Sequence, residues 1–72
     1  MTIQEGIERL AQINCANSMM QIGDELRDER QIIVNFLKIM EVISLDENGG
    51  FHFIGNDANE NKRNYLDAFE NF

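Results

Sequence analysis

Paired acidic residues are the feature of this sequence that is best suited to chemistry. Asp24 and Asp28, and likewise Glu25 and Glu29, are spaced i,i+4, so on a helix each pair would lie on one face, with Cβ atoms about 6 Å apart. That spacing is close to the distance between successive phosphates of a nucleic acid. Five more acids occur between residues 39 and 61 with no base among them: Glu41, Asp46, Glu47, Asp57 and Glu60. We expect these acids to form a face that binds a basic protein surface, or alternatively one that imitates a nucleic-acid backbone.

The ordinary explanation of such acids is a solvated surface. Arg27 and Arg30 lie among the first four acids and would neutralise part of a phosphate-like row. The chain has 13 acidic and 6 basic residues and a net charge of −7, which repels nucleic acid and anionic membranes and attracts basic surfaces. Direct binding to nucleic acid or to a membrane is therefore not expected.

Catalytic, cofactor and metal sites are not predicted. Cys15 and His52 occur once each, and no pattern in the sequence brings them together, so we do not expect an enzyme. A calcium loop that began at Asp46 would need glycine at its sixth position and glutamate at its twelfth, where the chain has Phe51 and Asp57. Neither a glycine-rich phosphate loop nor the spacing of metal ligands occurs in the sequence.

Aromatic residues near the C-terminus form a second candidate binding surface. Tyr65, Phe69 and Phe72 would share one face of a helix with Leu66. Such a face usually covers the core of its own domain. The alternative is that the aromatic side chains insert into an apolar groove on a partner protein, as amphipathic helices do.

An apolar seam at heptad spacing dominates the middle of the chain. Its members are Met19, Ile22, Leu26, Ile33, Phe36, Met40 and Ile43, and Glu29 is the one seam position that is not apolar. A helix of this pattern must bury its stripe, and a chain of 72 residues has limited material to cover it. We therefore expect a homodimer in which the seam from Met19 to Ile43 is buried partly in the domain and partly across the dimer. The residues from Met19 to Met40 would form the dimer contact, with Glu29 paired to Arg27 or Arg30 of the other chain.

Capping patterns predict the first two helices. Thr2 and Glu5 form a capping box, which predicts a helix over residues 3–15. The seam predicts a second helix that reaches residue 43. This helix begins either at Ser18, within a second possible capping box, or after Gly23 with the next aspartate as its cap. The sequence leaves both starting points open.

A turn pattern predicts a β-hairpin after the seam. Glu47-Asn48-Gly49-Gly50 is flanked by apolar residues at alternating positions, namely Ile43, Leu45, Phe51 and Phe53. Asn-Gly accepts the positive φ angles that a tight turn requires. Asp57 and Glu60 then form a third capping pair, which predicts a final helix that runs almost to the C-terminus.

This order of elements predicts one small domain over residues 1–72, mainly α with one β-hairpin in the order α-α-β-β-α. The alternative is a winged-helix-like domain with a C-terminal helix, in which helices near residues 3–15, 18–26 and 29–43 precede the hairpin as its wing. Such a domain would suggest a transcriptional regulator. Acids at the start of its recognition helix and in its wing, Asp28, Glu29, Asp46 and Glu47, oppose contacts with DNA phosphates.

A single cysteine excludes an intrachain disulfide and favours a reducing compartment. The sequence shows neither a signal-peptide pattern nor an apolar run long enough for a membrane span, so we expect a cytoplasmic protein. The function expected from these observations is a non-enzymatic, acidic interaction module. It would bind a basic protein surface stoichiometrically and act as an inhibitor or regulator of a larger complex, without a cofactor.

Overall fold

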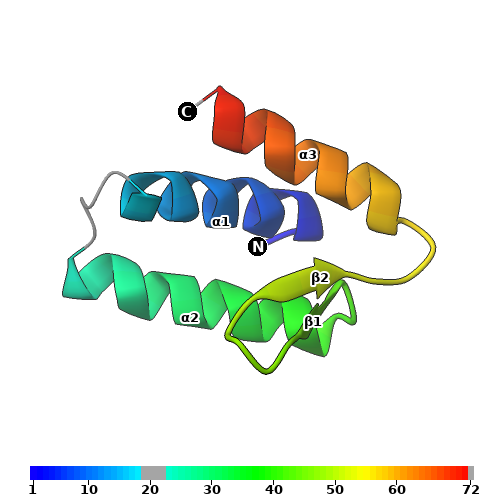
Figure 1. Cartoon of the computed structure of the whole chain (residues 1–72), viewed down its shortest axis with the longest axis horizontal. Coiled ribbons are helices and arrows are strands. Elements are labelled where there is room, and N and C mark those ends of the chain that lie inside the picture. Colours follow the sequence, from blue (N-terminus) through cyan, green and yellow to red (C-terminus); the bar gives the residue numbers. More distant parts are fainter. Residues whose placement is uncertain (19–22, 72) are drawn as a thin grey trace.

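The helices and strands follow the predicted order (Figure 1). The computed structural model describes residues 1–18 and 23–71, and within these residues it contains α1 (Ile3–Ser18), α2 (Asp24–Ile39), β1 (Ile43–Leu45), β2 (Phe51–Phe53) and α3 (Ala58–Glu70). The prediction of a mainly α fold with one β-hairpin is confirmed. In the described part of the chain, no helix is long and apolar enough to cross a membrane.

Helix α1 is central and lies between α2 and α3 (Figure 1). It begins with the predicted capping box, in which the Thr2 backbone N–H donates to the Glu5 carboxylate (2.9 Å) and the Glu5 N–H donates to the Thr2 hydroxyl (3.1 Å). The hydrogen bond from the Thr2 backbone, and after it the one with the Thr2 side chain, lowers the pKa of the Glu5 carboxyl group. Ile7, Leu10 and Ile13 of α1 are buried, so this helix supplies the middle of the core.

Helix α2 uses most of its described seam residues inside the protein. Ile33 is buried, Leu26 and Phe36 pack against the core, and only Met40 is about half exposed, at 49%. Met19 and Ile22 lie outside the described residues. Most described members of the seam therefore lie in the core of the chain itself, which is the part of the seam expected to be buried within the domain.

The start of α2 agrees with the second of its two predicted starting points, and its end differs from the prediction. The helix begins at Asp24 with Gly23 as an extended N-cap, φ −104° and ψ 178°, so the aspartate is the first helical residue rather than the cap. Its carboxylate and that of Glu25 lie in the first turn, where the helix dipole favours negative charge. The helix ends at Ile39 instead of residue 43, and it is continuous over residues 24–39. The winged-helix alternative needs a break between residues 26 and 29 and is wrong.

The hairpin is confirmed, with the register that the alternating pattern requires. Strands β1 and β2 pair antiparallel, and Ile43 faces Phe53 across the ladder. Gly49 has a positive φ of 82° in the turn. The Asp46 carboxylate accepts hydrogen bonds from the backbone N–H groups of Asn48 (2.9 Å) and Gly50 (2.8 Å). Asp46 therefore stabilises the loop of the hairpin.

Helix α3 lies along α1 on the side away from α2 (Figure 1). Asp57 occupies the N-cap position but makes no side-chain capping hydrogen bond, so the predicted capping pair with Glu60 does not form. The half-buried ring of Tyr65 packs against Phe51 and Phe53 of the hairpin, with centroids 5.4 and 5.8 Å away. Tyr65 thus packs on the core of its own chain, and Phe69 lies beside it with ring centroids 6.1 Å apart. Phe72 lies outside the described residues.

Candidate functional site

The structure divides the predicted acidic face into separate groups. Asp24, Glu25 and Asp28 are exposed at the beginning of α2, whereas Glu41 follows the other end of this 16-residue helix, which is about 24 Å long. Asp46 and Glu47 lie at the tip of the hairpin, and Asp57 and Glu60 lie at the beginning of α3. The nine acids therefore do not form one continuous row.

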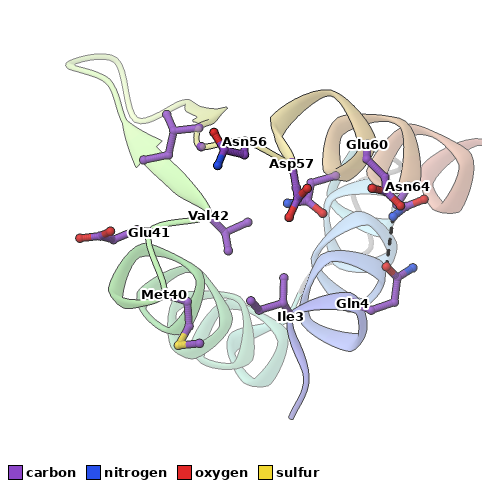
Figure 2. A pocket seen from close by; sticks show the side chains of 12 residues that line it. Ile3, Gln4, Met40, Glu41, Val42, Asn56, Asp57, Glu60 and Asn64 are labelled. Atoms are coloured by element: carbon purple, nitrogen blue, oxygen red, sulfur yellow. Dashed lines mark hydrogen bonds between the residues drawn. The ribbon is translucent and has the colours of Figure 1, made fainter.

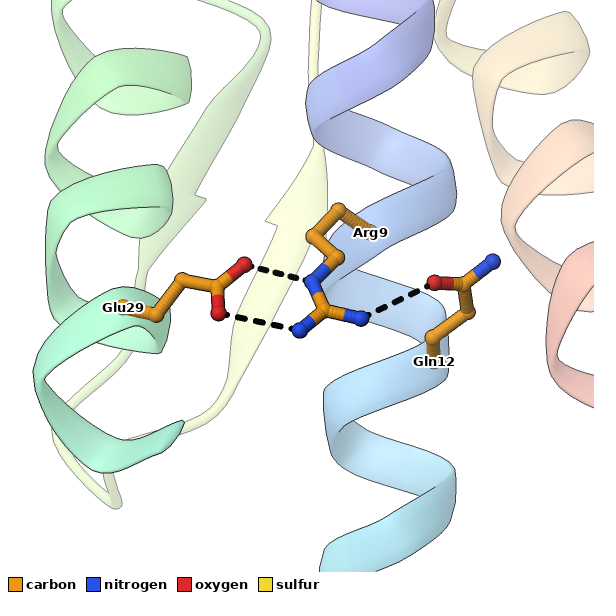
Figure 3. Close-up of polar contacts among 3 residues, drawn as sticks. All are labelled: Arg9, Gln12 and Glu29. Carbon is orange, nitrogen blue, oxygen red and sulfur yellow. Dashed lines mark hydrogen bonds and ion pairs between the residues drawn. The ribbon is translucent and has the colours of Figure 1, made fainter. Parts of the chain in front are cut away.

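Glu29 belongs to none of these groups, because it is paired inside the chain (Figure 3). The Arg9 guanidinium of α1 makes two hydrogen bonds to the Glu29 carboxylate, from Nε to Oε2 (2.5 Å) and from Nη2 to Oε1 (2.9 Å). A third guanidinium nitrogen, Nη1, donates to Gln12 Oε1 at 3.2 Å. Hydrogen bonding from Arg9 lowers the pKa of Glu29, and hydrogen bonding to Glu29 raises the pKa of Arg9. The expected intermolecular partner of Glu29, Arg27 or Arg30 of a second chain, is replaced by Arg9 of the same chain.

Glu41, Asp57 and Glu60 line a hollow of about 420 Å³ between α1, the segment that joins α2 to β1, and α3 with the segment before it. We call this hollow the acidic pocket (Figure 2). Its other lining residues are four amides and four aliphatic side chains, together with Gly55: Gln4, Asn56, Asn61 and Asn64, and Ile3, Met40, Val42 and Ile54. Among the described residues that line it, none is basic. It brings three of the predicted acids, from two different parts of the chain, to one concave surface.

The acidic pocket combines an apolar floor with a polar rim (Figure 2). Ile3 and Val42 point toward its interior, and the Asn64 side chain donates to Gln4 Oε1 at 3.1 Å along one side. The Glu41 side chain extends outward from the rim. Such a surface suits a ligand with an aliphatic stem and a cationic head, since the stem can lie on apolar atoms while the head meets carboxylates. A lysine or arginine side chain has this chemistry.

The chain places Glu41 at the rim by an unusual helix ending. The Val42 N–H donates to Leu37 O (2.9 Å) and the Glu41 N–H donates to Lys38 O (3.1 Å), which is the hydrogen-bond pattern of a Schellman motif. Glu41 holds the left-handed position of this motif, with φ 59°. Glycine normally occupies this position, because a Cβ atom there is sterically unfavourable. This motif also ends α2 before residue 43.

Other predicted candidates are not brought together. Cys15 is buried in α1 and His52 is exposed on β2, and Cys15 does not line the acidic pocket or the hollow that His52 borders. His52 lies beside Asp46, with Nε2 3.4 Å from Oδ2. In residues 1–18 and 23–71, no group of three or more histidine, cysteine or acidic side chains is arranged to hold a metal ion.

The sequence analysis missed the amides of the acidic pocket and the arginine that holds Glu29. Asn61 and Asn64 lie on the face of α3 that also carries Glu60, and their i,i+3 spacing is a pattern that could have identified them. The pattern around Arg9 is less informative than this spacing: it shows only that the arginine borders the apolar face of α1. Gln4 meets Asn64 across 60 residues of sequence, and no local pattern predicts that contact.

Comparison with known proteins gives no relative from which a function could be carried over. The chain matches no protein-family model, no curated protein and no solved structure. The function is therefore inferred from the geometry of the described residues.

Proposed function

We propose that this protein is a non-enzymatic interaction module that binds a basic protein surface stoichiometrically through its acidic pocket. A lysine or arginine side chain of the partner would lie on Ile3 and Val42 and place its charge near Asp57 and Glu60. The observation that carries the proposal is the absence of any base among the described lining residues of a pocket that is lined by three acidic residues. Binding of this kind would let the protein act as an inhibitor or regulator of a larger complex.

The backbone conformation of Glu41 supports the proposal independently of the number of charged residues in the pocket. A non-glycine residue in the left-handed region costs about 1 kcal/mol relative to glycine, and local strain of this kind clusters at functional sites. The Glu41 side chain is exposed, and among the described residues it makes no ion pair that would offset this cost. A role in binding explains why a carboxylate is present at this position.

Imitation of a nucleic acid by the first turns of α2 is less well supported. Glu29 is held by Arg9, and Arg27 Nη1 lies 4.0 Å from the Asp24 carboxylate. Only Glu25 and Asp28 of the four paired acids lack a nearby arginine in the described ion pairs. Such a partly neutralised row is a poor copy of a phosphate backbone, so we favour the basic protein partner.

The expected homodimer remains part of the proposal, with its contact limited to the outer face of α2. Ile32 and Ile39 lie two turns apart on the outer face of α2, where they are 67% and 78% exposed. They are not the residues of the predicted seam, most of whose described members face α1. If two copies associate, we expect this outer face of α2 to form the contact. Ile39→Asp should then reduce the molar mass measured by light scattering at high protein concentration from that of a dimer to that of a monomer.

The experiment that tests the proposed function compares two triple variants of equal charge. Glu41→Gln/Asp57→Asn/Glu60→Gln neutralises the acidic pocket, and Asp24→Asn/Glu25→Gln/Asp28→Asn removes three exposed acids of α2. Both change the net charge from −7 to −4. A fluorescein-labelled octapeptide of alternating lysine and glycine serves as the probe in a fluorescence-anisotropy titration.

The pocket variant should bind the lysine peptide at least tenfold more weakly than the native chain, and the α2 variant should change the affinity by less than threefold. This difference is expected because a pocket contact is local, whereas net charge acts equally in both variants. Equal weakening by the two variants would show that only net charge matters, and the pocket would then have no role in the binding.

A further inference from the structure

A second hollow lies between the hairpin and α3, and its charge is opposite to that of the acidic pocket. It measures about 560 Å³, within the range of small binding sites. We call it the basic groove and define it by three aromatic and three basic lining residues: Phe51, Phe53 and Tyr65, and Arg30, His52 and Lys62. Among its described lining residues none is acidic. In a chain with a net charge of −7, this local excess of positive charge is a distinct surface.

The floor of the basic groove is a packed aromatic cluster. The rings of Phe51 and Phe53 meet edge-to-face, with centroids 5.5 Å apart at 81°, and those of Phe51 and Tyr65 do so at 5.4 Å and 83°. All three side chains are half-buried and pack against the core. The exposed parts of the rings therefore form a fixed apolar surface, since edge-to-face packing holds each ring in place.

Asn14 of α1 holds both the floor and one cation of the groove. Its side-chain nitrogen donates to the Tyr65 hydroxyl at 2.9 Å, and its carbonyl oxygen accepts from Arg30 Nε at 2.8 Å. The guanidinium of Arg30 is thus oriented before any ligand arrives. A preorganised donor loses less side-chain entropy on binding than a free one.

The cations of the groove have capacity left for a ligand. In the described structure, no carboxylate lies within ion-pair distance of Arg30 or Lys62. The Arg30 Nη1 and Nη2 atoms make no hydrogen bond to a described residue. His52 is less available, because the Asp46 carboxylate lies 3.4 Å from its Nε2. Arg30 and Lys62 are therefore the two groups that an anionic ligand would meet.

We propose that the basic groove binds an acidic peptide segment of a partner protein, with one aromatic or aliphatic side chain as its anchor. The anchor would lie on Phe51, Phe53 and Tyr65, and carboxylates on either side of it would pair with Arg30 and Lys62. Charge complementarity selects this ligand over a basic one. The groove is on a different face of α3 from the acidic pocket, so this site goes beyond the proposed function and does not depend on it.

A single-stranded nucleic acid fits the basic groove less well than an acidic peptide. Bases stack on exposed ring faces, and a strand carries a phosphate at every nucleotide. Here the ring faces are partly covered by neighbouring rings, and a longer strand leaving the groove would meet Asp46 and Glu47 at the tip of the hairpin. A peptide with a few carboxylates avoids both difficulties.

The test is an NMR titration of the ¹⁵N-labelled full chain with pentapeptides whose central residue is phenylalanine, tryptophan, tyrosine or leucine, flanked by two glutamates on each side. At least one of these peptides should shift the backbone amides of residues 51–53 and 62–66. The matched peptide with lysine in place of glutamate, and the one with serine at the centre, should shift them much less.

Two variants of equal charge show whether the binding uses the groove. Arg30→Gln/Lys62→Gln should weaken binding of the best glutamate peptide at least tenfold. Arg27→Gln/Arg63→Gln, which removes two cations outside the groove, should change it by less than threefold. Because Arg30 contacts Asn14, the single variant Lys62→Glu of an exposed residue serves as a second test and should weaken binding at least threefold.

Four results would overturn the proposal. In the NMR titration these are the absence of any shift of amides 51–53 with every glutamate peptide, and shifts of these amides by the lysine peptide that are as large as those by the glutamate peptide. The third is equal affinity of the two double variants for the glutamate peptide. The fourth is a larger shift of the same amides by oligothymidylate than by the glutamate peptide. Shifts of these amides that depend on the concentration of the protein alone would overturn it too, because they would identify a second copy of the chain as the occupant.

Discussion

The two hollows on opposite faces of α3 differ in what their side chains do for the fold. The floor of the basic groove is made of Phe51, Phe53 and Tyr65, which pack against the core. The charged rim of the acidic pocket is made of Glu41, Asp57 and Glu60, which are exposed and make no ion pair within the described residues. The floor of the basic groove holds the protein together, whereas the charged rim of the acidic pocket consists of residues that the fold can lose.

This difference determines how each site can be tested. A change in the floor of the basic groove alters stability and binding at once, so only its cations can be changed without affecting the fold. The acids of the acidic pocket can be neutralised freely, because they contribute charge to a chain that already carries a net charge of −7. Variants of the two regions should therefore differ in how much they change the free energy of unfolding.

The largest effect is expected at Tyr65, which joins the aromatic cluster to Asn14. Tyr65→Ala should lower the free energy of unfolding by about 2–4 kcal/mol, since it removes a half-buried ring from the core. Tyr65→Phe keeps the ring and removes only the hydrogen bond from Asn14, so it should cost about 0.5–1.5 kcal/mol. Urea denaturation followed by circular dichroism measures both. A loss of less than about 1 kcal/mol for Tyr65→Ala would contradict the role of the groove floor in the fold.

The opposite sign is expected at Glu41 on the rim of the acidic pocket. Glu41→Gly should raise the free energy of unfolding by about 0.5–1 kcal/mol, because glycine adopts the left-handed position of the Schellman motif without a steric cost. Glu41→Ala removes the same charge but keeps the Cβ atom. It therefore measures the effect of losing the carboxylate without the relief of backbone strain. If alanine stabilised the chain as much as glycine in urea denaturation, the effect would belong to the charge and the argument from strain would be wrong.

The ion pair between Arg9 and Glu29 predicts a dependence of stability on pH. The folded pKa of Glu29 is lowered, so the pair stabilises the protein above the ordinary glutamate pKa of about 4.3 and loses this contribution as the pH falls through the lowered folded value. Glu29→Gln should cost about 0.5–1 kcal/mol at pH 7, because the pair is bidentate but more than a third exposed.

Below the folded pKa of Glu29, the native chain and Glu29→Gln should have similar stabilities. Unfolding curves at several pH values between 7 and the acid range show this convergence, with the exposed Glu25→Gln as the matched control. A difference between the native chain and Glu29→Gln that stays constant over this range would show that the cost arises from packing rather than from the ion pair.

The smallest effect on stability is expected for neutralisation of the acidic pocket. Glu41→Gln/Asp57→Asn/Glu60→Gln should change the free energy of unfolding by no more than about 0.5 kcal/mol, as is usual for exposed substitutions. Thermal unfolding curves of this variant and of the native chain, recorded under the same conditions, measure this change in stability. A loss of several kcal/mol would mean that these carboxylates have structural partners, and would remove the distinction between the two hollows.

The sequence predicted the order of the elements because the patterns that determine them are local. The capping box at Thr2 and Glu5 and the turn at Asn48-Gly49 each depend on residues a few positions apart. The capping box forms as expected, and the turn forms with a positive φ at Gly49 but not at Asn48. The end of α2 could not be placed, because the seam and the alternating strand pattern share Ile43 and the helix ends through backbone hydrogen bonds at Glu41.

The candidate site could be predicted only in part, because it depends on contacts between distant elements. The sequence identified the acids but not that Glu41, Asp57 and Glu60 meet around one pocket. Glu29 was expected to pair with a second chain because nothing near it in the sequence indicates Arg9, which lies 20 residues away. The three rings of the basic groove were recognised as apolar, but their proximity to Arg30 and Lys62 follows from the tertiary fold.

The central claim is that α3 separates two binding surfaces of opposite charge preference. The most direct test is to titrate one ¹⁵N-labelled sample with the lysine–glycine octapeptide and a second sample with the best glutamate pentapeptide. We predict that the lysine peptide shifts amides around Glu41, Asp57 and Asn64, and that the glutamate peptide shifts those of Phe51, Phe53 and Lys62. Shifts of the same amides by both peptides, or shifts by the lysine peptide centred on Asp24 to Asp28, would contradict the claim.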